Sequence, residues 1–349
     1  MRKKEWVMLF CLALLAGCAE QPLQKPVVDQ VFAQETENIE PELSVSDLII
    51  TDISITQTPT VEPTESPTPT QVPDSEPPVP PPSSEPESET PSPEQITGSE
   101  PPVRESSAPS FISVDNLNAS GLSNKKLGWY FMKNSEHQPT RGAAEIDISA
   151  YDGYYLGDTS KKYIWLTFDS GYENGYTSSI LDTLKEKNVQ AAFFCVGTYI
   201  RDNPELTKRM ADEGHLVVNH SEKHPSMPDI DDHRILDEIY SPAKRYKELT
   251  GADMPLFFRP PSGEYSERAM YITKEAGYKT IFWSFAYQDW LVDEQPGKEK
   301  ALKTLMDNLH NGEILLLHAV SSSNSEALPE FIDAVKAQGY EFKSLYDLP

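Results

Sequence analysis

After residue 162 the chain alternates short apolar runs with segments of helical periodicity, and this alternation constrains the fold more than any other feature. The apolar runs recur at intervals of roughly 25 to 40 residues. They lie at 163–167, 191–196, 216–219, 256–259, 280–283 and 313–317. A repeated strand–helix unit predicts an α/β protein with a parallel sheet and its helices outside. Six or seven units are too few for an eightfold barrel, so we expect a distorted or incomplete (β/α) barrel of about seven parallel strands.

The segments between these runs have apolar residues on one face and helix-end residues at their borders. They are 176–187, 204–213, 231–249 and 325–338. Asn203 precedes the second segment as an N-cap, and Gly214, Gly251 and Gly339 follow segments where a helix would stop. We therefore expect four amphipathic helices that pack on the sheet.

Ionisable side chains stand where several of the apolar runs end. They are Asp169, His220, His224, Arg259, Asp289 and His318. Because the carboxyl ends of parallel strands meet at one rim, we expect these side chains to lie close together. Each alone has an ordinary explanation: Arg259 could pair with a surface carboxylate, Asp289 could cap a turn, and His318 could be a satisfied core histidine. Their shared position favours a functional site.

A carboxylate and two imidazoles at neighbouring strand ends can hold a divalent metal and supply a general base. His220 and His224 are four residues apart, which places both on one face if a helix begins there. We expect the other histidines at the surface, because they lie near helices or in the segment before residue 162: His137, His215, His233 and His310. No dinucleotide fingerprint or phosphate loop follows any strand, which argues against a nucleotide-dependent enzyme.

Residues 1–18 have the three parts of an export signal. Basic residues begin it, an apolar stretch of about ten residues follows, and Leu15-Ala16-Gly17-Cys18 ends it. The apolar stretch is too short to span a bilayer comfortably. The last four residues resemble the lipobox of bacterial lipoproteins, which implies a lipid at Cys18 and an anchor on the outer face of the cytoplasmic membrane, facing the cell wall. An ordinary cleaved signal with a chance cysteine is the alternative.

Residues 19–107 have the composition of a disordered linker rich in Pro, Ser, Thr and Glu. Between Ala19 and Ser110 there are roughly eighteen acidic residues and two basic ones, in a chain of net charge −25, which argues against nucleic acid as a partner. We expect the segment 108–161 to pack on a catalytic domain at 162–349. Of the cysteines, only Cys195 falls in this globular part, so no disulfide can form there.

The order of motifs from residue 162 onward resembles the polysaccharide deacetylase family, also called the NodB-homology domain. The matching motifs are Thr167-Phe168-Asp169, His220-Ser221-x-x-His224, Arg259-Pro260-Pro261-x-Gly263, Asp289-Trp290 and Leu316-x-His318. Within the family, residues 167–177 and Tyr155-Leu156-Gly157 are similar to sporulation-type enzymes that deacetylate muramic acid on the way to muramic δ-lactam. The resemblance covers about 162–349 and implies metal-dependent hydrolysis of an N-acetyl group.

The resemblance also implies which residues activate the attacking water. Asp169 would be the general base that takes a proton from this water, and Arg259 would hold Asp169 in place. His220 and His224 would bind the metal. Such a metal lowers the pKa of water and polarises the carbonyl group under attack.

Other matching residues would handle the leaving amine and the acetyl group. His318 would be the general acid that protonates the amine, and Asp289 would sustain the charged form of His318. Trp290 and Leu316 would line the acetyl pocket. The backbone N–H of Ser262 would bind the oxyanion of the tetrahedral intermediate.

One position departs from the family pattern. Many members have a second aspartate after the catalytic one, and it is the third protein ligand of the metal, whereas this chain has Ser170. A hydroxyl is a poorer ligand than a carboxylate, so we expect weaker metal binding, completed by water. We expect zinc, with manganese, magnesium or cobalt as alternatives. The muramic-acid group tolerates a residue other than a carboxylate here.

Several functions compete for this sequence. The leading one is deacetylation of N-acetylmuramic acid in peptidoglycan, toward muramic δ-lactam in spore cortex. The alternatives are a general N-acetylglucosamine deacetylase of peptidoglycan or chitooligosaccharides, and a noncatalytic wall-binding pseudoenzyme. A glycosidase needs two carboxyl groups facing one bond, but here histidines and Arg259 fall between Asp169 and Asp289 in the sequence. We expect a monomer whose partners are glycan strands and the membrane.

Overall fold

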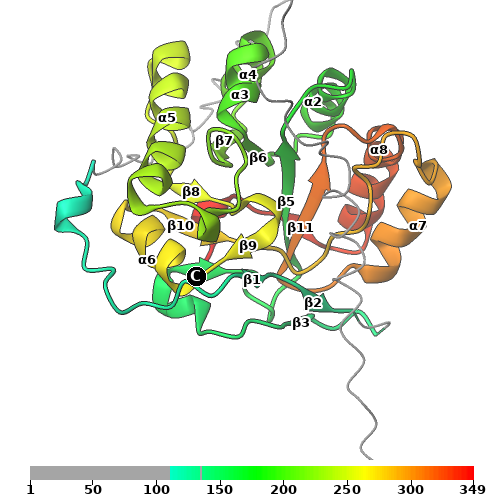
Figure 1. Ribbon diagram of the computed structural model, residues 1–349. Coiled ribbons are helices and arrows are strands. Elements are labelled where there is room, and N and C mark those ends of the chain that lie inside the picture. The colour runs from blue at the N-terminus through cyan, green and yellow to red at the C-terminus, as the bar shows by residue number, and fades with distance from the viewer. Residues whose placement is uncertain (1–110, 134–135) are drawn as a thin grey trace, which may run out of the picture. The chain divides into compact units, whose positions relative to one another are not determined.

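The computed structural model describes residues 111–133 and 136–349 (Figure 1). The export signal, Cys18 and the linker expected at 19–107 lie outside the described residues. Among the described residues, no helix combines the length and the apolar character that crossing a membrane requires.

The main sheet runs parallel throughout, and seven strands follow one another across it. In spatial order they are β11 (Glu313–His318), β5 (Tyr163–Ser170), β6 (Ala192–Cys195), β7 (Leu216–Asn219), β8 (Phe257–Phe258), β10 (Lys279–Ile281) and β4 (Gly153–Tyr154). The eighth strand, β12 (Glu341–Phe342), pairs in parallel with the beginning of β5.

The sheet curls into a half-barrel whose two edges approach each other. Leu156, just after β4, forms an isolated bridge with Glu313 of β11, and Phe285 bridges Leu315. The predicted incomplete barrel of about seven parallel strands is therefore confirmed. Strand β7 has the bounds predicted from its apolar run. Strands β5 and β11 continue beyond their predicted ends, so Asp169 lies within β5 and His318 lies within β11.

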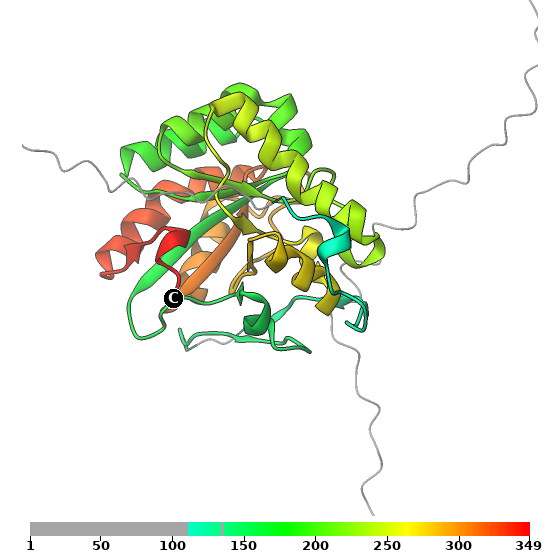
Figure 2. The same ribbon diagram turned by 90° about the vertical axis from the view of Figure 1, so that its left-hand side faces the viewer.

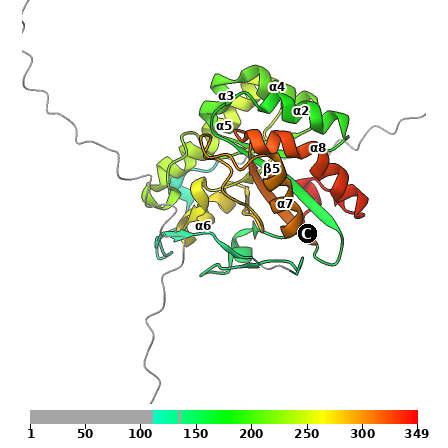
Figure 3. The ribbon, with the colours of Figure 1, turned by 90° about the vertical axis from the view of Figure 1, so that its right-hand side faces the viewer.

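The helices pack side by side around the outside of the sheet (Figures 1 and 3). They are α2 (Thr177–Glu186), α3 (Gly197–Asp202), α4 (Pro204–Asp212), α5 (Asp232–Thr250), α6 (Glu267–Glu275), α7 (Lys298–Asn308) and α8 (Ser322–Ala337). All four predicted helices form. Asn203 has the N-cap position of α4, but its amide donates to the Tyr199 carbonyl instead of capping the helix. Helix α8 begins three residues before the predicted start, because the Ser321 hydroxyl accepts the Asn324 N–H.

Alternating side chains of the strands fill two separate cores. Toward the helices, Leu166, Phe193 and Val217 join the largest buried cluster. On the opposite, inner face, Trp165 and Phe194 belong to a second cluster, which takes buried residues from six strands of the main sheet. Both faces are apolar, as expected of a parallel sheet covered on both sides.

The chain before residue 162 closes the open side of the sheet. It contains β1 (Leu127–Gly128), β2 (Phe131–Met132) and β3 (Arg141–Gly142), which Figure 2 shows in teal along the lower edge of the view. The start of the segment packs on α5, where the Ile112 N–H donates to the Tyr240 hydroxyl at 3.0 Å. Strand β1 pairs antiparallel with β9 (Glu264–Tyr265), and the Trp129 ring stacks on Phe282 at 4.6 Å between centroids. Strand β4 of this segment also belongs to the main sheet, while the division at residues 161 and 162 stays a prediction.

Candidate active site at the carboxyl ends of the strands

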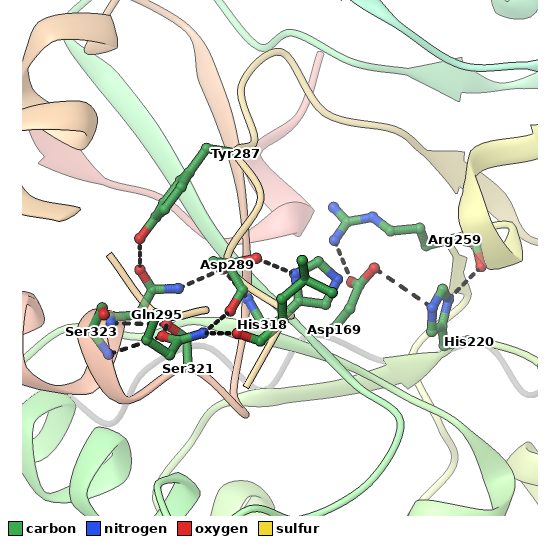
Figure 4. Close-up of polar contacts among 11 residues, drawn as sticks. Asp169, His220, Arg259, Tyr287, Asp289, Gln295, His318, Ser321 and Ser323 are labelled. Atoms are coloured by element: carbon green, nitrogen blue, oxygen red, sulfur yellow. Dashed lines mark hydrogen bonds and ion pairs between the residues drawn. The ribbon is translucent and has the colours of Figure 1, made fainter. Parts of the chain in front are cut away.

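Asp169, near the end of β5, is bound to a fully buried arginine from the loop after β8. Nη1 of Arg259 donates to Asp169 Oδ1 at 2.6 Å (Figure 4). Nη2 of Arg259 donates to the Thr167 hydroxyl at 3.0 Å. Burial alone would raise the pKa of Asp169, but the charge of the Arg259 guanidinium and its hydrogen bond outweigh this effect and hold the pKa below its ordinary value. Asp169 is therefore ionised at neutral pH and held in a fixed orientation.

Arg259 is held from several directions, which explains how a charge can be fully buried here. Its Nε donates to the Ile281 carbonyl at 3.1 Å, and its guanidinium lies 3.9 Å from the centre of the Phe194 ring. The Thr167 hydroxyl, which accepts the hydrogen bond from Arg259 Nη2, donates in turn to the Leu315 carbonyl at 2.7 Å. The Arg259–Asp169 pair is thus part of the rigid inner wall of the barrel.

His220 follows β7 and presents one ring nitrogen to Asp169. Its Nδ1 lies 2.8 Å from the Arg259 carbonyl oxygen, which can only accept, so Nδ1 carries the proton. The lone pair is therefore on Nε2, which lies 3.6 Å from Asp169 Oδ2. Burial lowers the pKa of His220, more than Asp169 raises it, and the ring is neutral at pH 7.

His224 meets His220 across a short loop. Their ring centroids are 4.9 Å apart, at 76° between planes. Although His224 keeps an exposed face, the atoms packed around its ring and the nearby His220 lower its pKa, so both imidazoles are neutral at pH 7. Neutral imidazoles are the form that binds a metal.

No helix begins between His220 and His224, so the two imidazoles do not share a helix face. Ser221 and His224 have positive φ values of 67° and 60°. The Asn219 side chain accepts the Ser221 N–H, and the Ser221 hydroxyl accepts the His224 N–H, each at 2.9 Å. Side-chain oxygens thus take the N–H groups that a helix would use, and the loop rather than a helix face brings the two rings together.

The donor atoms at this place fit a divalent metal bound by two imidazoles and water. The carbonyl of Arg259 on His220 Nδ1 is the outer partner that metal-binding histidines usually have. Ser170 is fully buried beside Cys195, its register partner on β6, and among the described residues its hydroxyl has no nitrogen or oxygen partner within hydrogen-bond distance. In the part of the chain that the structure describes, no three His, Cys, Asp or Glu side chains form such a group, so the two imidazoles would need water to complete the ligand set.

His318 ends β11 directly beside Asp169, its register partner on β5. Its Nδ1 donates to Asp289 Oδ1 at 2.6 Å, and its backbone N–H donates to Asp289 Oδ2 at 2.8 Å (Figure 4). Burial would lower the pKa of His318, but the Asp289 carboxylate outweighs this and raises it. His318 is therefore poised to carry a proton near neutral pH, with Nε2 as the atom free to donate it.

The remaining predicted residues lie at or near the same rim. The Trp290 ring is 5.4 Å from the His318 ring, and Leu316 precedes His318 by two residues, on the same face of β11. Ser262 is exposed in the 3-10 turn after β8, with a left-handed backbone at φ 55°. Their roles in binding the acetyl group and the oxyanion stay predictions.

Two histidines predicted at the surface are buried, so that prediction was wrong for them. His215 is 5% exposed, and the Phe193 ring lies edge-on to it. His310 is fully buried: its Nδ1 donates to the Asn308 carbonyl, and its Nε2 lies 2.9 Å from the Ser284 hydroxyl. His137 and His233 are exposed as expected.

Sequence reasoning missed the residues that hold Asp289 in place. The Asn324 amide donates to Asp289 Oδ2 at 2.5 Å, and the Gln295 amide donates to the Asp289 carbonyl at 2.6 Å. The Tyr287 hydroxyl in turn donates to Asn324. The available signal was the polar run at 321–325, just before and at the start of the predicted helix.

Comparison with known proteins identifies the relatives of this chain. Residues 156–281 match the family described as Polysaccharide deacetylase. Peptidoglycan-N-acetylmuramic acid deacetylase PdaA of Bacillus subtilis is 43% identical over 232 residues, which are 66% of this chain and 88% of that protein. Peptidoglycan-N-acetylglucosamine deacetylase of Bacillus cereus is 32% identical over 194 residues, which are 54% of this chain and 89% of that protein.

Solved structures agree with the sequence comparison. The structure of Bacillus subtilis PdaA, described as a family 4 carbohydrate esterase, has a TM-score of 0.64 and 43% sequence identity with this chain. The match covers 65% of this chain and 98% of that structure. The shared fold, the nearly full coverage of these relatives and the identity establish that this chain belongs to the polysaccharide deacetylase family.

Proposed function

We propose that this protein removes the acetyl group from N-acetylmuramic acid in peptidoglycan, with the help of a bound divalent metal. Family membership makes it a hydrolase of N-acetyl groups. The relative named for muramic acid is 43% identical, against 32% for the one named for glucosamine, which supports the choice of sugar. Formation of muramic δ-lactam in spore cortex is the proposed use of the product.

One observation carries the proposal: a carboxylate and an imidazole with opposite pKa shifts stand side by side at the ends of β5 and β11. Asp169 has a lowered pKa and is an acceptor, whereas His318 has a raised pKa and is a donor. Titratable groups pushed apart in this way are the mark of an acid–base pair. We assign Asp169 as the general base and His318 as the general acid.

The lowered pKa of Asp169 also supports a metal-dependent reaction. A carboxylate with such a pKa is too weak a base to deprotonate ordinary water efficiently. A divalent metal, when bound, lowers the pKa of water and polarises a carbonyl group. His220 and His224 would hold it, with Ser170 or water completing the set, and Asp169 lies close enough to His220 to reach the same water.

The other residues of the rim complete the reaction. His318 gives a proton from Nε2 to the departing amine while Asp289 stabilises the charged ring. Trp290 and Leu316 bound the space for the acetyl methyl group, and the Ser262 N–H receives the oxyanion. The products are acetate and a glycan with a free amine.

We further propose that the enzyme works outside the cell, at the wall. Two relatives are named as peptidoglycan deacetylases, and peptidoglycan is the polymer of the cell wall. Lipidation of Cys18 would hold the chain at the outer face of the membrane, with residues 19–107 as a tether that lets the catalytic domain reach the glycan strands.

Mass spectrometry of digested glycan tests the proposal. We expect full-length protein to release acetate and to leave the free amine on muramic acid. Asp169→Asn should lose about 10²–10⁴ in rate, the usual effect of removing a general base. Asp293→Asn, which changes an exposed carboxylate in the loop after β10, should keep full activity.

The same experiment separates the alternatives. A free amine on glucosamine, or an equal yield from chitin oligomers, would redirect the assignment to a glucosamine deacetylase. Zinc, manganese and magnesium are titrated in turn while acetate is followed. If none of the three metals produces acetate release, the proposed enzymatic activity is refuted and a wall-binding pseudoenzyme is favoured.

A further inference from the structure

A buried polar cluster behind His318 ties the Asp289 carboxylate to the first turn of α8 (Figure 4). Asp289 is fully buried and accepts three hydrogen bonds on its side chain. Its Oδ1 accepts from His318 Nδ1, and its Oδ2 accepts from the His318 backbone N–H and from Asn324 Nδ2 at 2.5 Å. His318 supplies two of these three hydrogen bonds, and Asn324 supplies the third.

The Asn324 amide can face Asp289 in one orientation only. The Asp289 carboxylate only accepts hydrogen bonds, so the Asn324 NH₂ group points to it, and Asn324 Oδ1 accepts from the Tyr287 hydroxyl on its other side. Burial, and then the charge of Asp289, raise the pKa of Tyr287, which therefore stays protonated and keeps donating. The result is an ordered chain of donors from Tyr287 through Asn324 to Asp289.

The Asn324 side chain has no other task in the described structure. Its backbone N–H is satisfied by the Ser321 hydroxyl, which caps α8, so the amide is not needed at the helix end. The residue is 1% exposed, and a buried amide that spends its NH₂ on a carboxylate stabilises the charged form of that carboxylate. This arrangement points to a role at Asp289.

The backbone of Asp289 is fixed to the same helix. Gln295 Nε2 donates to the Asp289 carbonyl at 2.6 Å, while Gln295 Oε1 accepts from the Ser321 hydroxyl at 2.6 Å and from the Ser323 N–H at 3.2 Å. Main chain and side chain of Asp289 are therefore both anchored on the start of α8. With the backbone fixed in this way, Asn324 is left to set the rotation of the carboxylate.

We propose that Asn324, oriented by Tyr287, is a positioning residue for the general acid: it holds the Asp289 carboxylate so that each oxygen meets one N–H group of His318. The inference rests on the proposed role of His318 in proton donation. Without the amide, Oδ2 keeps a single donor and the carboxylate is free to turn away from Nδ1. His318 then loses its fixed ring orientation toward the leaving amine.

Proton NMR of the full-length protein reads this hydrogen bond directly. A short N–H···carboxylate bond such as that between His318 and Asp289 gives a far-downfield proton resonance, which is assigned by its loss in His318→Gln. In Asn324→Ala we expect this resonance to move upfield or to vanish through exchange with water. Tyr287→Phe keeps the ring and removes only the hydroxyl, so it should give a smaller change in the same direction.

Coupling between the two residues is a second readout. Because Tyr287 acts through Asn324, the double variant should match Asn324→Ala alone. On the proposed substrate, kcat should fall about tenfold while KM stays the same, since a hydrogen bond to a charged group contributes on this scale. Asn308→Ala is the control, because that amide donates only to the Thr304 carbonyl on α7; the resonance should not change there.

The outcomes are distinct from those that test the proposed function. An unchanged downfield resonance in both Asn324→Ala and Tyr287→Phe overturns the inference, whatever happens to activity. If Asn324→Ala fails to fold, Tyr287→Phe decides by the same resonance. A protein without deacetylase activity would refute the proposed function, yet the resonance would still report whether Asn324 positions Asp289.

Discussion

Replacing Asp289 with asparagine should move the alkaline limb of the pH–rate profile to lower pH. In the proposed role of general acid, His318 has no proton to give to the leaving amine above its pKa, so the rate should fall there. The Asp289 carboxylate, 2.6 Å from His318 Nδ1, is what raises this pKa against the effect of burial. With asparagine at this position the opposing effect of burial remains, and the pKa of His318 must fall.

The size of the shift follows from the hydrogen bond that is weakened. A hydrogen bond to a charged group contributes about 1.5–3 kcal/mol, and about 1.4 kcal/mol corresponds to one pKa unit. Because the His318 side chain is 24% exposed and partly screened by water, we expect the lower part of this range, about one pH unit.

Acetate release by the full-length protein, measured from about pH 5 to 10 on muramic-acid glycan, gives the profile of kcat/KM. This quantity reports the ionisations of the free enzyme, so the alkaline limb follows His318. Asp293→Asn removes an exposed charge from the same loop and should leave the limb in place. If Asp289→Asn also leaves it in place, Asp289 does not control the proton on His318 and the acid assignment fails.

Three further predictions concern the opposite side of the rim. Arg259→Met leaves Asp169 buried without its partner and should destabilise the fold by about 3–5 kcal/mol in urea unfolding; a change below about 1 kcal/mol would contradict the burial argument. Ser170→Asp should increase the affinity for zinc about tenfold or more, measured by competition with a chromogenic chelator, whereas the control Ser179→Asp on α2 should leave it unchanged. If Ser170→Asp binds zinc with the affinity of the wild type, Ser170 does not belong to the metal site. The pKa of Asp169 is lower in the folded state than in the unfolded state, so its ion pair stabilises the protein above the unfolded-state pKa near 4, and this stabilisation is lost as the pH falls through the folded-state pKa. The difference in unfolding free energy between wild type and Asp169→Asn should therefore shrink below about pH 4, and a difference that stays constant with pH would refute this argument.

The sequence predicted the sheet and the gathering of the site because both follow from local patterns. Apolar runs such as 216–219 are buried on both faces, so they stand out as strands. Once the strands are parallel, their carboxyl ends must share a rim, and Asp169 and His318 become direct neighbours in register. Pairing of β5 with β11, which are about 150 residues apart in the sequence, was not itself readable from the pattern.

Other features depend on partners that lie far apart in the chain. His310 sits in the turn between α7 and β11 and looked like a surface residue, but Ser284 from the loop after β10 meets its ring in the core. Asn324 looked like an ordinary polar residue before a helix, and its partner Asp289 lies 35 residues away. The loop at His220 to His224 has a helical spacing, yet the Asn219 and Ser221 side chains compete for its N–H groups.

The partners of the proposed general acid, His318, and of the proposed general base, Asp169, differ although both residues stand at neighbouring strand ends. Asp169 and His318 are register neighbours, so one could neutralise the other if nothing else acted on them. Arg259 donates to Asp169 Oδ1 and favours the carboxylate form, while Asp289 accepts from His318 Nδ1 and favours the protonated ring. Each partner is fully buried and held in place: Arg259 Nε donates to the Ile281 carbonyl, and the Asp289 carbonyl accepts from the Gln295 side-chain amide. The protein thereby maintains a proton acceptor and a proton donor side by side at one pH, as amide hydrolysis requires.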